Sequence, residues 1–395
     1  MKILVLNSGS SSIKCQYYLD QKSIASLLVE RIGEKESYAQ IIHKNTKEEV
    51  YCSVENHHQA LNTILSLLKE SKILTSIGEL DAVGHRVVHG GEVFKAPTLI
   101  DDKVIETIRS LIPLAPLHNP ENLEAIEILH KNYPDLPQVA VFDTAFHQSM
   151  PEYSYLYPLP YALSKAENIR RYGFHGTSHA YVAKEAASIM KKPLDALNLI
   201  TLHLGNGASV TAIESGKSID TSMGMTPLEG VMMGTRCGDI DAAIIPFLMQ
   251  QKEMDITTID KMMNKESGLK GICGSNDMRE VLKQTEQNDP LSQLALEMYT
   301  YRIKKYIGAY TVALGRVDAI IFTGGIGEHA SKVRELVCKG LDQSIGLYID
   351  SEKNRLPFSE NISIHKKESK IQLFIIATNE ELEIVLQTQK VIDSK

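Results

Sequence analysis

A strand–turn–strand unit occurs twice in this chain, and the repeat constrains its architecture more than any other feature. Residues 2–6 form an apolar run, 7–12 are a turn of Asn, Gly and Ser, and 13–19 resume as a strand. Residues 199–214 repeat this order, with a turn of Gly, Asn, Ala and Ser at 205–209. Because the copies lie about 200 residues apart, the repeat predicts two related domains.

The remaining segments predict helices that alternate with strands. At the usual domain size, 395 residues correspond to two domains or three. Apolar residues at helical spacing predict helices at 60–70 and 291–314, and Asn119 before Pro120 predicts a helix N-cap. This alternation indicates an α/β fold, and residues 147–160, rich in Tyr and Pro, predict the crossing between domains. The other predicted elements are strands at 138–142, 319–323 and 372–377 and a final helix after 380.

Composition excludes several classes of partner. The chain has 42 Lys and Arg against 49 Asp and Glu, a net charge of -7, whereas a nucleic-acid-binding surface is basic. Its five cysteines contain no CxxC pair, which favours reduced thiols in the cytoplasm. The longest apolar run, 242–249, contains Pro246 and is too short to cross a bilayer, and the apolar N-terminal run is too short for a signal peptide. We therefore expect a cytoplasmic protein with neither nucleic acid nor membrane as partner.

Glycine-rich turns follow three apolar strands, at 7–12, 205–209 and 324–327. Such turns let backbone N–H groups approach a phosphate, so three of them favour a nucleotide ligand over ordinary tight turns. A Walker A loop does not explain them, because Thr211 stands where its first glycine is required. Residues 325–330 match a dinucleotide fingerprint, but only about 70 residues follow, too few for a complete dinucleotide-binding domain.

Two histidine pairs have the i, i+4 spacing of zinc ligands on a helix: His85 with His89, and His175 with His179. Neither pair contains the glutamate of an HExxH motif, and Gly176 favours a helix start over a helix interior. Hydrogen-bonding histidines, structural or catalytic, are therefore favoured over a metal site.

Two arginines are flanked by glycines, Arg86 in 84–91 and Arg236 in 234–239. A planar guanidinium grips a carboxylate or a phosphate through two hydrogen bonds, so both are candidate anion ligands. For Arg236 the alternative is a structural ion pair with Asp239 or Asp241.

Together these segments resemble the acetate kinase family, from Asn7 to Glu381. The resemblance implies a fold shared with sugar kinases, heat-shock chaperones and actin: duplicated actin-like (ribonuclease H-like) α/β domains with a nucleotide cleft between them. It also implies a homodimer. The expected domains are 1–149 with the returning helix 380–395, and the nucleotide-binding domain 150–379. The matching segments are NSGSSSIK (7–14), GHRVVHGG (84–91), APLHNP (115–120), FDTAFHQSMP (142–151), RRYGFHGTSH (170–179), HLGNGASV (203–210), DTSMGMTPLEGVMMGTRCGDID (220–241), FTGGIGE (322–328) and TNEEL (378–382).

Matched residue by residue, the resemblance implies an ATP-dependent, Mg²⁺-requiring kinase that interconverts acetate and ATP with acetyl phosphate and ADP. Asn7 and Glu380 would hold Mg²⁺, with Mn²⁺ as the alternative ion. The implied catalytic residues are Asp143, His175 and Arg236; Arg86 would bind substrate, and the acyl pocket would be Val88, Leu117, Phe174 and Pro227. The implied ATP-binding residues are Lys14, His203, Leu204, Gly205, Asn206, Gly207, Asp277, Met278, Arg279, Gly325, Ile326, Gly327, Glu328 and His329.

Asp143 is the family's catalytic acid, yet the reaction needs no general base. A carboxylic acid with a pKa of about 4.3 is already ionised near neutral pH. We therefore predict that Asp143 positions an arginine or the water shell of the metal. Val88 is a moderately bulky wall that favours acetate over propionate or a longer acid. The alternatives from other classes are a non-catalytic actin-like nucleotide-binding module and a Rossmann dehydrogenase.

Overall fold

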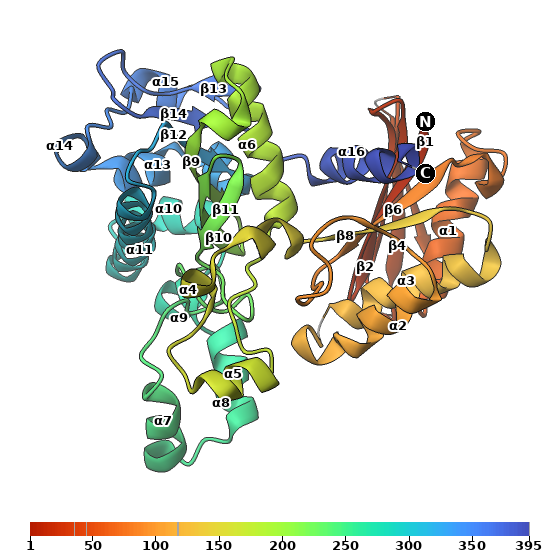
Figure 1. Ribbon diagram of the computed structural model, residues 1–395, viewed down its shortest axis with the longest axis horizontal. Coiled ribbons are helices and arrows are strands. Elements are labelled where there is room, and N and C mark those ends of the chain that lie inside the picture. Colours follow the sequence, from red (N-terminus) through yellow and green to blue (C-terminus); the bar gives the residue numbers. More distant parts are fainter. Residues whose placement is uncertain (35, 45, 117, 395) are drawn as a thin grey trace. The chain divides into compact units, whose positions relative to one another are not determined.

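The structure is a computed structural model that describes residues 1–34, 36–44, 46–116 and 118–394. It divides into two compact units, unit 1 with Met1–Phe146 and Asn379–Lys395 and unit 2 with His147–Thr378 (Figure 1). The first division falls at 146/147 rather than at 149/150, because His147 is buried in unit 2 against Ser218 and the Phe174 carbonyl. Within the described ranges, no helix is both long enough and apolar enough to span a membrane.

Unit 1 is built on an eight-stranded sheet with the order β5-β4-β3-β2-β1-β6-β8-β7. Its first five strands form an antiparallel meander, and β6 and β8 add to β1 in parallel. The strands are β1 (Lys2–Gly9), β2 (Ser12–Leu19), β3 (Lys22–Glu30), β4 (Ser37–His43), β5 (Thr46–Cys52), β6 (Ala82–Val87), β7 (Thr98–Leu99) and β8 (Gln138–Phe142).

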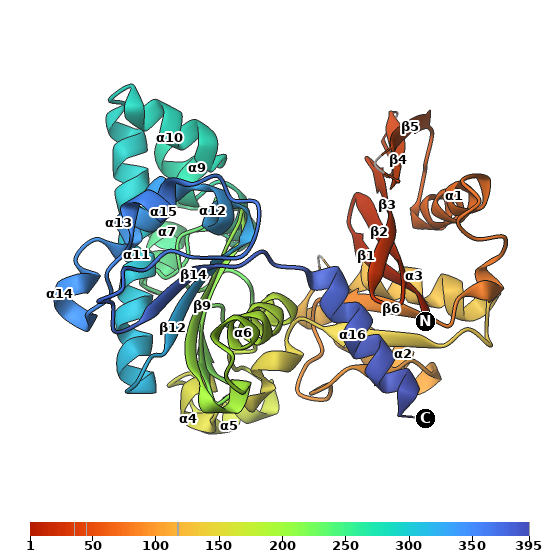
Figure 2. The ribbon, with the colours of Figure 1, turned by 90° about the horizontal axis from the view of Figure 1, so that it is seen from above.

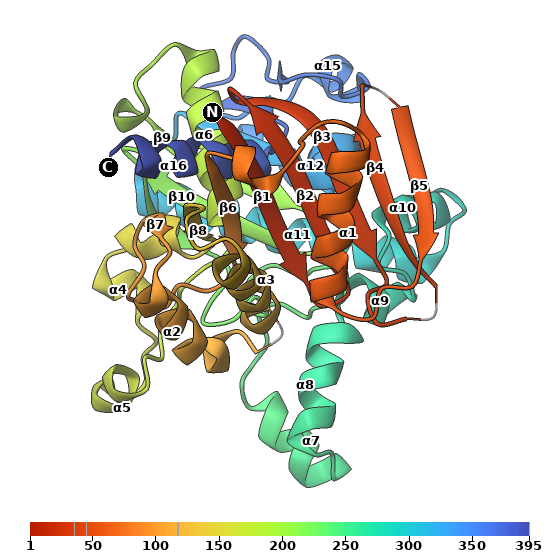
Figure 3. The ribbon, with the colours of Figure 1, turned by 90° about the vertical axis from the view of Figure 1, so that its right-hand side faces the viewer.

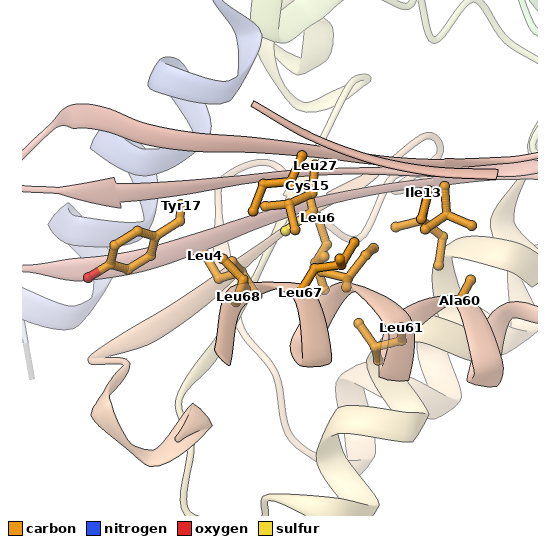
Figure 4. Close-up of a cluster of buried hydrophobic side chains, with 14 of the residues drawn as sticks. Leu4, Leu6, Ile13, Cys15, Tyr17, Leu27, Ala60, Leu61, Leu67 and Leu68 are labelled. Atoms are coloured by element: carbon orange, nitrogen blue, oxygen red, sulfur yellow. The ribbon is translucent and has the colours of Figure 1, made fainter. Parts of the chain in front are cut away.

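Helices cover both faces of this sheet, which explains why β1 is apolar at consecutive positions. Alternate residues point to opposite faces: Leu4 and Leu6 pack toward α1, and Ile3 and Val5 pack toward α16. Figure 3 shows α1 lying across β2 to β4, and Figure 4 shows the core between them. Each fully buried aliphatic side chain contributes about 1.5–3 kcal/mol. The helices are α1 (His57–Glu70), α2 (Asp102–Ser110), α3 (Asn119–Asn132) and α16 (Glu380–Asp393).

The last helix, α16, lies on β6 at a glycine. A Cβ atom on Gly84 would lie 2.6 Å from Thr388 Oγ1 and 2.7 Å from Ile384 Cγ2. Only a residue without a side chain therefore allows α16 to lie this close to the sheet. This contact fixes the position of the first residue of α16, Glu380, relative to the strands of unit 1.

Unit 2 is built on a six-stranded sheet with the order β11-β10-β9-β12-β14-β13. Figure 2 shows α6 on one side of this sheet and α11 on the other. The strands are β9 (Asn198–Leu204), β10 (Ala208–Glu214), β11 (Lys217–Thr221), β12 (Ala319–Thr323), β13 (Ile362–Ser363) and β14 (Gln372–Ile375). The helices are α4 (Glu152–Tyr155), α5 (Tyr161–Ala166), α6 (Gly176–Met190), α7 (Ile244–Lys252), α8 (Ile256–Lys265), α9 (Gly268–Cys273), α10 (Met278–Glu286), α11 (Pro290–Leu314), α12 (Gly324–His329), α13 (Ser331–Cys338), α14 (Leu341–Ile345) and α15 (Ser351–Arg355).

The two sheets share one topology, which confirms the duplication predicted from the repeated turns. In unit 1 the order β3-β2-β1-β6-β8 has two antiparallel pairings followed by two parallel ones. In unit 2 the order β11-β10-β9-β12-β14 has the same sequence of pairings. The repeated segments are the β1–β2 and β9–β10 hairpins.

Two local predictions differ from the structure. The predicted turn at 7–12 is mostly strand, because Gly9 pairs with Ser12 and only two residues make the turn. The backbone N–H groups of Asn7 and Ser8 therefore lie within β1. The N-cap of α3 is His118 rather than Asn119, whose side chain instead accepts from the His89 N–H (3.1 Å) and donates to its carbonyl (3.0 Å).

Candidate functional site

Three neighbouring parallel strands of unit 1 end side by side, and each carries a polar residue there. Asn7 lies near the end of β1, Arg86 near the end of β6, and Asp143 directly follows β8. Arg86 Nε and Nη2 donate to the two oxygens of Asp143 (3.2 and 2.5 Å), and Nη1 donates to Asn7 Oδ1 (3.1 Å). Asp143 is only 1% exposed. The carboxyl ends of parallel strands thus assemble a guanidinium held by an acid and an amide.

Glu380 lies beside this cluster, at the first residue of α16. Burial raises its pKa to about 7, Arg86 opposes this shift, and the Asp143 carboxylate adds to it. Its Oε1 atom is buried without a hydrogen-bond partner among the described residues. The Arg86 side chain is partly buried, and Asp143 and Glu380 outweigh the effect of burial and raise its pKa. Lys14 stands opposite Asn7 on β2 and is close enough to lower the Glu380 pKa.

The acyl-pocket residues divide between the units. In unit 1, Val88 is buried and its N–H donates to Asn122 Oδ1 (3.0 Å). Leu117 lies outside the described residues. In unit 2, Phe174 is buried, and the carbonyl of Pro227 accepts from Arg236 Nη1 (3.4 Å).

His85 and His89 are neutral histidines with structural hydrogen bonds, as expected from the sequence for this pair. His85 is a strand residue bonded to Gln138 (2.8 Å), and His89 Nδ1 accepts from the Gly91 N–H (3.0 Å). Burial lowers both pKa values to about 4. Since β6 is a strand, the i, i+4 spacing does not bring this pair together as on a helix.

His175 is the N-cap of α6 and adopts a left-handed conformation (φ 55°, ψ 23°), which is rare for a residue with a side chain. Its ring stacks on that of His203, with 4.2 Å between centroids. His203 lies at the end of β9, next to the turn of Gly205 and Gly207. Backbone strain of this kind collects at functional sites because the surrounding structure must enforce it.

Arg236 faces the same turn from a different loop. A Cβ atom built on Gly207 would lie 3.3 Å from Arg236 Nη1 and 3.6 Å from His175 Nε2, so both groups converge on this glycine. Burial lowers the Arg236 pKa, and Nη1 donates to the Pro227 carbonyl and to Met233 Sδ (3.8 Å). Within the described ranges it pairs with no carboxylate. The alternative ion pair is thus absent there, and Asp239 instead accepts from the Gly230 N–H (2.8 Å).

A cavity of about 610 Å³ opens beside this turn, a volume typical of small-molecule sites. It forms because β9 and β12 are parallel neighbours, so the 205–207 turn and α12 follow adjacent strand ends. Asn276, Leu282 and Ala330 also line it and were missed; the Asn276 side chain donates to Asn206 Oδ1 (3.1 Å). The predicted residues that line it are Gly205, Asn206, Asp277, Met278, Arg279, Gly325, Ile326 and His329.

The other predicted nucleotide residues of unit 2 do not line this cavity. Leu204 is a core residue of β9, and the Gly327 carbonyl accepts from buried Arg334 (2.8 Å). Glu328 Oε1 accepts from the Gly324 N–H (2.9 Å) and the Thr378 N–H (3.2 Å). Glu328 thus anchors the start of α12, which carries Gly325 and Ile326, to the segment after β14.

Asp277 and Arg279 form a self-contained pair at the rim of the cavity. Asp277 is the N-cap of α10 and accepts from the Arg279 N–H (2.9 Å), and Arg279 Nη2 lies 2.6 Å from its other oxygen. This pairing lowers the Asp277 pKa to about 2. The Arg279 side chain is 91% exposed, so the rim presents a solvated guanidinium.

Comparison with known proteins identifies the family. The model of the acetokinase family matches residues 2–386. The chain belongs to the acetokinase family. It is 63% identical to the acetate kinase of Sulfurovum sp. (strain NBC37-1) over 392 residues, 99% of each chain. It is 50% identical to the acetate kinase of Halothermothrix orenii over the full length of both.

Solved structures of acetokinases also match this fold closely. The Porphyromonas gingivalis acetate kinase superposes with a TM-score of 0.94 at 43% identity, covering 99% of both chains. A propionate kinase from Francisella tularensis superposes with a TM-score of 0.92, also at 43% identity, covering 98% of this chain and 99% of that one. The acetokinase family has the duplicated actin-like fold, so the fold prediction is confirmed and the Rossmann interpretation of 325–330 is wrong.

Proposed function

We propose a mechanism for the reaction that family membership assigns to this chain, the transfer of a phosphoryl group from ATP to acetate. The transfer is direct and in line: an acetate oxygen attacks the γ-phosphorus and ADP leaves. Charge spreads over the three equatorial oxygens in the transition state, so catalysis consists mainly of positioning and of cationic donors. This chain supplies Arg86, Arg236, His175 and Lys14 for that purpose.

The observation that carries the mechanism is the state of Arg236. The guanidinium is partly buried and has no anionic partner among the described residues, so burial disfavours its charge and no carboxylate there offsets this cost. A carboxylate or phosphoryl group bound at Gly207 would provide that compensation. His175 Nε2 lies 3.6 Å from the same Cβ position on Gly207 and can donate to the same group.

Asp143 has a positioning role in this mechanism. Acetate is already ionised near neutral pH, so its oxygen needs no base to become a nucleophile. Both carboxylate oxygens of Asp143 are engaged by Arg86, which supports the orientation of that guanidinium toward the substrate carboxylate.

The residues Asn7 and Glu380 fit a magnesium ion. Glu380 Oε1 is a buried acceptor without a partner in the described part of the chain, and Glu380 and Asp143 concentrate negative charge there. The described residues hold no group of three or more His, Cys, Asp or Glu side chains suited to a metal. Magnesium does not need one, because it takes one or two carboxylates together with water and substrate phosphates. When bound, it would neutralise charge on the ATP phosphates.

The test is hydroxylamine trapping. With ATP, Mg²⁺ and acetate the wild-type chain forms acetyl phosphate, which hydroxylamine converts to a coloured hydroxamate. We expect Arg236→Ala to lower this rate by at least about 100-fold, the range for losing one preorganised donor to developing charge. Retention of the wild-type rate in the folded variant would contradict the role of Arg236.

Acetate is the proposed preferred acid, with propionate as the second candidate because a propionate kinase matches this fold nearly as well as an acetate kinase does. A methylene group is worth only about 1–3 kcal/mol, so some propionate activity is expected. The measurement is kcat/KM for acetate, propionate and butyrate. Preference for butyrate would contradict the acetate assignment and leave the kinase mechanism intact.

We also propose a cytoplasmic homodimer. All five cysteines are free, which supports a reducing compartment. None of the residues of α7 is buried, and Ile244, Phe247 and Met249 are 39%, 56% and 44% exposed, an apolar surface that a second copy would cover. Light scattering should find a dimer for the wild type and a monomer for Phe247→Glu. A wild-type monomer would contradict the proposal.

A further inference from the structure

A chain of three side chains extends behind His175, into the interior of unit 2. Ser209 Oγ lies 2.9 Å from His175 Nδ1 and 2.7 Å from His179 Nε2. His179 Nδ1 lies 2.6 Å from Thr201 Oγ1. His179, Ser209 and Thr201 are all 0% exposed.

The register of the hairpin explains this alignment. Thr201 and His203 are two residues apart on β9 and therefore share a face, and Ser209 pairs with His203 across the hairpin. The first turn of α6 carries His175 and His179, whose i, i+4 spacing places both on one side of the helix entry. The spacing that resembled a zinc motif thus serves a hydrogen-bonded chain.

Proton positions follow from Thr201. Its hydroxyl has one hydrogen-bond partner among the described residues, His179 Nδ1. A buried hydroxyl hydrogen without an acceptor is unfavourable, so Thr201 donates and His179 Nδ1 accepts. Burial, together with His147 and His203, holds the pKa of His179 well below its usual value, so its ring is neutral. A neutral imidazole that accepts at Nδ1 carries its hydrogen on Nε2.

The same argument fixes the donor and acceptor of the next two hydrogen bonds, which lead to His175. His179 Nε2–H donates to Ser209 Oγ, and the single hydrogen of Ser209 has His175 Nδ1 as its other partner. The opposite direction would place the His179 hydrogen on Nδ1 and leave the Thr201 hydroxyl without an acceptor. One direction therefore satisfies every hydroxyl in this chain of hydrogen bonds.

We infer that Thr201, His179 and Ser209 are positioning residues that hold neutral His175 with its hydrogen on Nε2, directed to Gly207 and the Arg236 guanidinium. A donor fixed in this way needs no protonation of the imidazole and costs no reorganisation during the reaction. The consequence for catalysis rests on the proposed function, whereas the tautomer itself does not.

Nitrogen NMR tests the tautomer directly. The full-length protein is labelled with ¹⁵N-histidine, and long-range ¹H–¹⁵N spectra are recorded at pH 8, with His175 assigned by the signals lost in His175→Gln. We expect a protonated Nε2 and an unprotonated Nδ1 in the wild type. Ser209→Ala removes the donor to Nδ1, and its His175 signals should move toward the average of both tautomers. A wild-type His175 protonated on Nδ1, or Ser209→Ala signals identical to the wild type, would overturn the inference.

A second pair of variants keeps the test independent of any folding defect in Ser209→Ala. Thr201→Val has nearly the same shape and removes only the terminal donor, so it should shift the His175 signals in the same direction, and Thr201→Ser should restore them. Ser178→Ala is the matched control, because Ser178 Oγ lies 2.8 Å from Nδ1 of the stacked His203 and not of His175. Its His175 signals should stay at the wild-type positions; a shift as large as that of Ser209→Ala would overturn the inference.

Kinetics separates positioning from substrate binding. Ser209→Ala and Thr201→Val should each lower kcat about tenfold, with KM for acetate and for ATP within about twofold of the wild type, and Thr201→Ser should recover kcat. A loss confined to KM would contradict the role in the transition state. If the wild type lacked kinase activity, the proposed function would fail while the NMR result still decided the tautomer.

Discussion

Replacing Asp143 with Asn tests whether this acid acts through Arg86 or as a base. The two side chains are joined by two hydrogen bonds, Nε to Oδ1 (3.2 Å) and Nη2 to Oδ2 (2.5 Å). Asparagine keeps one acceptor oxygen and turns the other into an N–H group that faces a donor. One hydrogen bond to a charged group is therefore lost, worth about 1.5–3 kcal/mol. At 1.36 kcal/mol per tenfold, we expect kcat/KM for acetate to fall about 10- to 150-fold.

The assay is the rate of acetyl phosphate formation between pH 6 and 9. Asparagine removes the negative charge that helps to raise the Glu380 pKa, so the ratio of variant to wild type should vary only near that pKa and be constant between pH 8 and 9. Full recovery of Asp143→Asn at high pH would refute the positioning role, since only a missing base is replaced by hydroxide. Thermal unfolding is the control, because breaking a buried ion pair also costs about 3 kcal/mol of stability.

A double-mutant cycle sharpens the same test. If Asp143 acts only by orienting Arg86, then Asp143→Ala in an Arg86→Ala background removes nothing further. The double variant should match Arg86→Ala within about twofold. Losses that multiply would show that Asp143 acts on the reaction independently.

Three further results are expected. In Gly207→Ala the new Cβ would lie 3.3 Å from Arg236 Nη1, so the guanidinium must shift by a few tenths of an ångström. This shift should lower kcat/KM about tenfold without changing the melting temperature. Unchanged kinetics would contradict the convergence of Arg236 and His175 on this glycine. Glu328→Ala should raise KM for ATP about tenfold. Glu328→Gln keeps the acceptor oxygen for the Thr378 N–H and should leave KM unchanged. Equal effects of the two variants in steady-state kinetics would argue against the role of Glu328 in anchoring α12. His85 has a folded pKa of about 4, so the unfolded state takes up its proton first as pH falls below 6.5. Urea unfolding at pH 7 and 4.5 should show about 2–3 kcal/mol less loss of stability in His85→Gln than in the wild type, and an equal loss would contradict the buried neutral histidine.

The parts of the fold that the sequence predicted are those with a strong local pattern. The strand at 138–142 is apolar from Val139 onward and buried on both faces, and the helix predicted at 291–314 is α11. β5 gave no such signal, because its sequence Thr-Lys-Glu-Glu-Val-Tyr-Cys is mostly exposed and is held in the sheet by its ladder with β4. Its formation depends on pairing with β4, the strand directly before it, rather than on its own composition.

The candidate site shows the same limit. Glycine-flanked arginines marked Arg86 and Arg236 as anion ligands, but the partner of Arg86 lies 57 residues away. That pairing arises because β6 and β8 are neighbours in register, Val87 opposite Phe142. Thr201 and Ser209 carried no signal of their own, since hydroxyl residues are common in strands. Their significance appears only once α6 covers the face that they share with His203.

Because α16 packs on β6 at Gly84, unit 1 is completed only when the last helix has been synthesised. Unit 1 has its first strand at one end of the chain and Glu380 near the other, with all of unit 2 made in between. Until α16 emerges, Ile3 and Val5 lack their cover and the polar cluster lacks Glu380. A polypeptide still on the ribosome, or one cut short before residue 379, is therefore without the acid proposed for the metal. The proposed activity therefore depends on synthesis of α16. A fragment that binds a nucleotide through unit 2 alone could not transfer its phosphoryl group.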